Sequence, residues 1–215
     1  MKILVLSIFL LSSLGVTGCS SLQPREDRVK SISEFLNQEQ HYALFDPTSI
    51  QSEEKLNLFG VPDYGKRISR QYEINSPVVR VIETFTQSSP VLSRTIIVAP
   101  EKAKDLSLPP SYPVLFFHSD WHLIYRRLPP NFYTSQLQVG MISKIIPLGQ
   151  VLSGHGPTAL KTASWEGKCT YDAFEGKFFS LDEWEANNAE RLRQGITAAQ
   201  DYCAEKFISE FANQR

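Results

Sequence analysis

The fold is decided by the C-terminal stretch SLDEWEANNAERLRQGITAAQDYCAEKFISEF, residues 180–211. Ser180 and Glu183 have the spacing of a capping box, and acidic residues crowd the first turn, as at the start of a helix. Apolar residues then recur at helical spacing: Leu181, Trp184, Leu192, Ile196, Ala199, Cys203, Phe207 and Phe211. A helix of about thirty residues spans ~45 Å, so its apolar stripe has to cover a sheet or a partner.

The residues before this helix carry the strongest strand patterns of the chain. Strands are predicted by apolar and β-branched runs at residues 114–117, 121–128, 136–146 and 159–171. In residues 136–146, apolar and polar positions alternate, as on a strand with one face in water. Glu175 and Gly176, between two phenylalanines, predict a tight hairpin turn.

The N-terminal half gives weaker signals. Residues 78–85 and 91–98 are rich in β-branched side chains and predict a strand pair, with Pro77 opening a helix as the alternative. A short helix is predicted from Ser31, which stands in capping-box form, and His41 is expected to face solvent on that helix.

These patterns together predict an α+β fold, in which an antiparallel sheet is covered by the long C-terminal helix and a short helical segment lies near the N-terminus. Residues 31–215 are expected to form a single domain, because 42% hydrophobic and 21% charged residues are values typical of globular proteins. A formal net charge of −1, without a long basic run, argues against nucleic acid as a partner.

The first eighteen residues have the three-part pattern of a secretory signal. Lys2 supplies a positive charge, residues 3–11 are apolar, and small residues lead to Gly18. The apolar run is much shorter than the ~20 residues that a membrane-spanning helix needs. Residues 1–18 are therefore predicted to be a signal peptide that is removed after export.

Val16-Thr17-Gly18-Cys19 resembles the lipobox of bacterial lipoproteins. The resemblance covers only the leader. It implies cleavage before Cys19, a thioether-linked lipid on that residue and an amide-linked acyl chain such as palmitate, which together hold the protein to a membrane. Ser20, in place of aspartate, implies delivery to the outer membrane of a Gram-negative cell. Residues 19–30 then form a polar tether that keeps the domain on the periplasmic face, whereas ordinary signal-peptidase cleavage is the alternative.

The chain has three cysteines. Acylation of Cys19 would leave Cys169 and Cys203 as an even pair in an oxidising compartment. Cys169 falls on the apolar side of its strand pattern and Cys203 on the apolar stripe of the helix, so packing of these two faces brings the thiols together. We expect a Cys169–Cys203 disulfide, with two buried free thiols as the alternative.

The sharpest candidate for chemistry is His118-Ser-Asp120-Trp-His122. On an unbroken strand, His118, Asp120 and His122 share a face and could hold one metal ion, with His155 as a fourth ligand, as in a periplasmic metal-dependent hydrolase. Ser119-Asp120 is also favourable turn sequence, and a hairpin there would separate the two histidines. We therefore expect a polar turn, with no metal and no cofactor.

Aromatic residues are dense in residues 112–133, where they either line a groove for a lipid, peptide or glycan, or fill the core. No catalytic motif stands out elsewhere. The sequence thus predicts a non-catalytic lipoprotein that binds a protein partner of the cell envelope, as an assembly or transport component.

Overall fold

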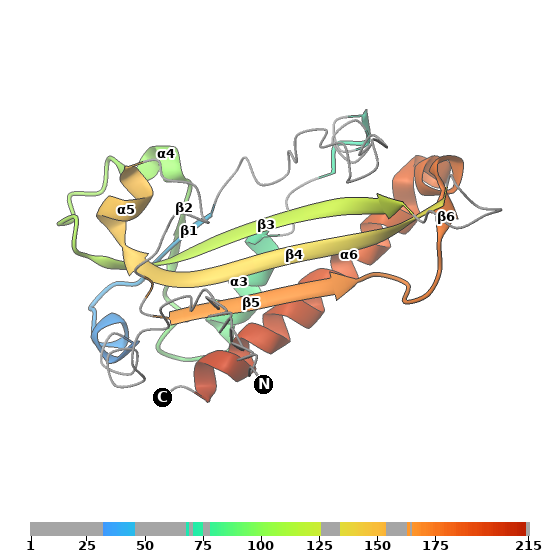
Figure 1. Ribbon diagram of the computed structural model, residues 1–215. Helices are drawn as coiled ribbons and strands as arrows, with labels where there is room; N and C mark the ends of the chain where they lie inside the picture. The colour runs from blue at the N-terminus through green and yellow to red at the C-terminus, as the bar shows by residue number, and fades with distance from the viewer. Residues whose placement is uncertain are drawn as a thin grey trace, which may run out of the picture.

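The computed structural model describes residues 32–45, 68, 71–74, 78–125, 134–153, 163 and 165–213 (Figure 1). A short helical segment covers residues 32–36. The labelled elements follow in the order β1 (Tyr42–Phe45), α3 (Val78–Gln87), β2 (Ile96–Val98), α4 (Pro100–Ala103), β3 (Pro113–Tyr125), β4 (Thr134–Pro147), α5 (Leu148–Leu152), β5 (Trp165–Asp172), β6 (Phe179–Ser180) and α6 (Leu181–Ala212).

The strands form one mixed sheet in the order β2-β1-β3-β4-β5, with β6 also paired to β4. The α+β class and the long C-terminal helix are confirmed. The expectation of an antiparallel sheet is correct for the pairings of β4 with β3, β5 and β6, but β1 pairs in parallel with both β2 and β3. The physical reason is the connection between β1 and β2, which passes through α3, and a crossover of this kind brings the chain back in the same direction.

Helix α3 occupies residues for which a strand was predicted. Val78, Val81, Ile82 and Phe85 are buried, and their spacing of three and four residues is that of one helix face. The alternative in which a helix opens at this point is therefore correct. Of the second predicted strand, residues 91–98, only Ile96–Val98 is a strand, and a turn precedes it. The β-branched residues of this segment favour a strand by intrinsic preference, but their spacing buries one side of a helix, and the helix forms.

Strand β3 runs without a break from Pro113 to Tyr125. The predicted turn at Ser119-Asp120 is wrong, because Ser119 pairs with Met141 of β4 and Asp120 pairs with Gly140. Strand β4 pairs with β3 along its whole length and supplies hydrogen-bond partners for the backbone of Ser119 and Asp120. A turn at these residues would lose that pairing. Strand β4 confirms the prediction for residues 136–146 and extends it slightly at both ends.

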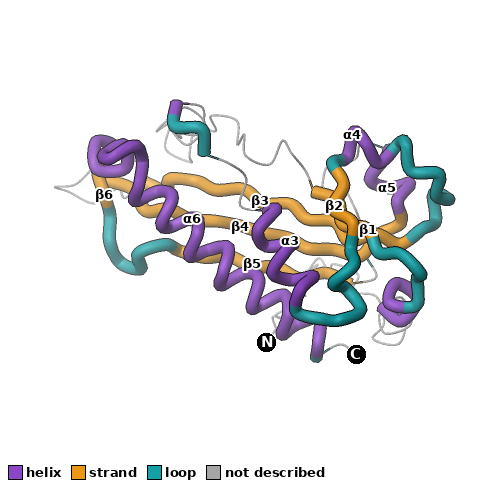
Figure 2. Tube along the Cα trace, turned by 180° about the vertical axis from the view of Figure 1, so that it is seen from behind, coloured by secondary structure: helices purple, strands orange, loops and turns teal. Residues whose placement is uncertain are grey.

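Helices α3 and α6 cover one face of the sheet, as Figure 2 shows from that side. Arg80 of α3 and Asp201 of α6 form an ion pair at 3.0 Å, which links the two helices. The main hydrophobic core lies between these helices and the sheet, and it includes Phe117 and Trp165 from the strands and Phe207 from α6. The apolar stripe read from the sequence thus packs against the sheet.

The start of α6 confirms the capping box, with the Glu183 backbone N–H donating to Ser180 Oγ and the Ser180 N–H donating to the Glu183 carboxylate. The helix is not continuous. Residues 186–189 are non-helical, and Asn187, Asn188 and Ala189 have φ values of 52°, 59° and 57°. This kink lets the first turn of α6 fold over the end of the sheet, where the Trp184 indole N–H donates to Ser135 Oγ at 2.9 Å.

The predicted hairpin at Glu175-Gly176 is a turn, with Gly176 at φ 73°, but it does not join two neighbouring strands. Strands β5 and β6 both pair with β4 and run in the same direction. Residues 173–178 therefore leave the edge of β4 at the end of β5, and the chain pairs with the same edge again in β6. A local turn signal does not specify which strand the chain meets next.

The N-terminal helical segment is shorter than predicted, and Tyr42 already belongs to β1. The expectation of an exposed His41 is wrong, because this side chain is buried and its ring lies edge-on to Phe35, with centroids 4.9 Å apart. His41 directly precedes β1 and is enclosed where the helical segment meets the sheet. Ser31 lies outside the described residues.

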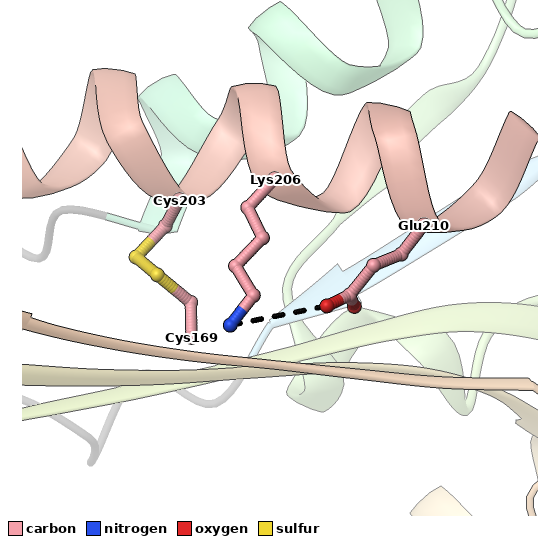
Figure 3. Close-up of a disulfide and its surroundings, with 4 residues drawn as sticks. All are labelled: Cys169, Cys203, Lys206 and Glu210. Atoms are coloured by element: carbon pink, nitrogen blue, oxygen red, sulfur yellow. Dashed lines mark ion pairs between the residues drawn. A yellow bond between two sulfur atoms is a disulfide. The ribbon is translucent and has the colours of Figure 1, made fainter. Parts of the chain in front are cut away.

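Cys169 of β5 and Cys203 of α6 form a disulfide, with their Cα atoms 5.6 Å apart (Figure 3). This confirms the predicted pairing. Both cysteines are buried, so the bridge lies between the helix and the sheet and fastens α6 to β5.

Candidate functional site

The two faces of the sheet differ in what covers them. Opposite α3 and α6, a smaller apolar cluster that includes Leu44, Val114, Phe116 and Leu148 lies with α4 and α5 at one end of the sheet (Figure 1). Farther along β3, β4 and β5, the same face becomes polar. We call this region the polar face; its polar positions and glycine are His118, Asp120, His122, Gln136, Gln138, Gly140, Lys144, Glu166, Lys168, Thr170 and Asp172, and Ile124 and Ile142 lie among them.

Alternation along β3 positions the first three of these residues. Ser119 and Trp121 point into the core with exposures of 1% and 2%, so His118, Asp120 and His122 project from the opposite face. These three side chains were the metal ligands considered from the sequence, and the unbroken strand places them on one face.

Asp120 and His122 are in direct contact. The Nε2 atom of His122 lies 3.3 Å from Oδ2 of Asp120, and the side chains are 31% and 43% exposed for His122 and Asp120. Burial alone would raise the pKa of Asp120. The hydrogen bond and charge of His122, together with the charge of His118, outweigh burial and hold the pKa of this carboxyl below its ordinary value. Asp120 is thus an ionised carboxylate at neutral pH.

Gly140 provides the space for this carboxylate. It stands opposite Asp120 in the register of β3 and β4, and a Cβ atom at Gly140 would lie only 2.6 Å from Asp120 Oδ1. The absence of a side chain therefore lets the carboxylate lie over the neighbouring strand. Sequence reasoning did not identify Gly140 as part of the site; its signal is a glycine within an otherwise regular strand pattern.

Side-chain pairs within β5 and between β4 and β5 organise the rest of the polar face. Glu166 accepts from Lys168 Nζ at 2.6 Å and lies 3.6 Å from Lys144 Nζ, and Lys144 is itself buried. Gln138 Nε2 donates to Asp172 Oδ1 at 2.8 Å. Neighbouring strands thus bring charges of both signs together on this face.

The remaining predicted site residues are not brought together by the described part of the chain. His155 and Cys19 lie outside it. Within it, no group of three or more histidine, cysteine, aspartate or glutamate side chains could hold a metal ion.

The aromatic segment is core and not groove as far as it is described. Phe117 and Trp121 belong to the main core, whereas Phe116 belongs to the smaller cluster on the opposite face. Phe132 and Tyr133 lie outside the described residues.

No protein-family model matches this chain, and no curated protein matches it significantly. Among the described helices, none combines the length and the apolar character needed to cross a bilayer.

Proposed function

We propose that the protein is an outer-membrane lipoprotein, held by lipid on Cys19, whose periplasmic domain binds a protein partner of the cell envelope without catalysing a reaction. The leader pattern of residues 1–19 supports the proposed export and lipid anchor. The Cys169–Cys203 disulfide independently supports export, because such bridges persist in oxidising compartments.

The observation that carries the proposal is the polar face. Helices cover the other face of the sheet, whereas this one presents partly exposed groups of both signs, such as Asp120, Lys168 and Glu166. Charges of both signs give a surface that selects a complementary protein surface and steers its approach. The face is too mixed in charge to favour a polyanion.

Photo-crosslinking in intact cells tests this assignment. A crosslinking amino acid at Thr170, exposed on the polar face, is expected to capture an envelope protein. The matched control is the same probe at Glu205, which is exposed on α6. Capture from Glu205 with none from Thr170 would show that the binding surface lies on the helical side.

A periplasmic metal-dependent hydrolase is the second candidate, using His118, Asp120, His122 and His155. The observation in its favour is that β3 is unbroken, which places three of these residues on one strand face. Its test is hydrolysis of ester and phosphoester substrates by zinc-loaded protein. Activity that is lost in Asp120→Asn would support the hydrolase over the binding component.

A further inference from the structure

We propose that Asp120 and His122 form a two-ligand binding site for a divalent transition-metal ion of the zinc class on the polar face. The site needs neither His155 nor any catalytic role, and it does not rest on the proposed partner. It follows from the distance between the two donor atoms, from the way in which the sheet holds them, and from their chemistry.

The donor atoms have the separation that one metal ion requires. Nε2 of His122 and Oδ2 of Asp120 are 3.3 Å apart. Two ligands bound tetrahedrally at ~2.0 to 2.1 Å from a zinc ion are ~3.4 Å apart. An ion at these distances from both atoms lies ~1.2 Å beside the line that joins them, so both side chains rotate slightly to direct their lone pairs at it.

The sheet fixes the backbone of both ligands and the face from which they project. Ser119 and Trp121, which alternate with the two ligands, are buried on the opposite face, so the strand cannot rotate without exposing the core. Gly140 leaves room for the Asp120 carboxylate beside β4. Because the backbone of both ligands is already fixed, binding has to order only the two side chains, and even two ligands can give measurable affinity.

The ligand types select the ion. One imidazole nitrogen and one carboxylate oxygen suit Zn²⁺, Ni²⁺ or Cu²⁺, whereas Mg²⁺ and Ca²⁺ prefer oxygen ligands alone. Partial exposure of both side chains lets an ion reach them from solvent. As no third ligand is available within the described residues, water or a donor from another molecule completes the coordination.

Isothermal titration of the mature lipoprotein, purified in detergent without a histidine tag, measures this binding. We expect one Zn²⁺ per chain and no heat from Mg²⁺. Asp120→Asn and His122→Ala should each weaken Zn²⁺ binding on the order of 10- to 100-fold, a loss that even an outer-shell partner of a metal can cause. The matched control is Asp172→Asn, which removes a carboxylate from the same face at the Gln138 pair and should leave the affinity unchanged.

Two results would overturn the proposal: no Zn²⁺ binding at millimolar concentration, or binding that persists unchanged in both ligand variants. His122→Gln, which keeps much of the side-chain volume and a polar end, replaces His122→Ala if that variant does not fold. Chemical-shift changes in the unmodified protein give a readout without any variant. They should centre on Asp120 and His122 during the Zn²⁺ titration, and changes centred elsewhere would assign the ion to another site.

Discussion

Removal of the disulfide is expected to destabilise the domain strongly. Cys203→Ser breaks the bridge to Cys169, which closes a loop with a sequence separation of 34 residues. Restriction of the unfolded chain by a loop of this length contributes ~3.8 kcal/mol. Since the net stability of a domain is about 5–15 kcal/mol, this one bond supplies a large part of it.

Urea unfolding of the purified protein, followed by tryptophan fluorescence, measures the loss. Trp121, Trp165 and Trp184 are all buried, so their emission reports on the core. Thermal unfolding of the same protein, which has a domain of this size, should show a fall in melting temperature of roughly 8–15 °C. Reduction of the unmodified protein should produce a loss similar to that of Cys203→Ser.

The control is Lys206→Ala, next to the bridge in Figure 3, where Lys206 and Glu210 form a partly exposed ion pair at 3.8 Å. Loss of this pair should cost no more than about 0.5 kcal/mol. The reasoning is refuted if alkylation shows that both cysteines are reduced while the unfolding midpoint stays where it was.

Three other perturbations address the anchor, a buried histidine and the helix–sheet contact. Cys19→Ala should leave the protein uncleaved or free of the membrane, because lipid is its proposed anchor; cell fractionation checks this, and a processed variant that stays with the outer membrane would contradict it. Burial lowers the pKa of His41, so the unfolded chain takes up a proton before the folded protein does, and stability should fall as the pH drops below about 6.5. His41→Phe should flatten this dependence in urea unfolding between pH 7.5 and 5, and an unchanged slope would assign it to other groups. Gly195→Ala should destabilise by ~1–3 kcal/mol in spite of its better helix propensity, because the new Cβ would lie 2.6 Å from Leu137 Cδ2 and 3.1 Å from Ala173 Cβ; a raised melting temperature would show that α6 can move away from β4 without cost.

Local patterns in the sequence were enough to predict those elements in which the end signals and the spacing of apolar residues indicate the same structure. The capping box at Ser180 and Glu183 and the long apolar stripe identify α6, and strict alternation identifies β4. The disulfide could be predicted because each cysteine lies on the apolar side of its own element, and the two apolar sides have to pack together.

Tertiary contacts decided the elements for which the sequence is ambiguous. Residues 78–87 fit a strand by composition and a helix by spacing, and burial of one helix face against α6 and the sheet selects the helix. Ser119-Asp120 fits a turn by composition, but pairing with β4 on one side and burial of Ser119 keep it in a strand. In each case a long-range contact overrides a local preference that is worth less than about 1 kcal/mol.

The candidate site shows the same division. The sequence by itself named His118, Asp120 and His122, since the residue types and their spacing are local properties. Only the tertiary structure decided that they share one face, that Gly140 makes room for the carboxylate, and that Lys144 and Glu166 lie on the same surface. The three residues share a face because β3 is unbroken and successive side chains of a strand alternate between its faces. Strand register places Gly140, Lys144 and Glu166 beside them, because it depends on pairing between residues that are distant in the chain.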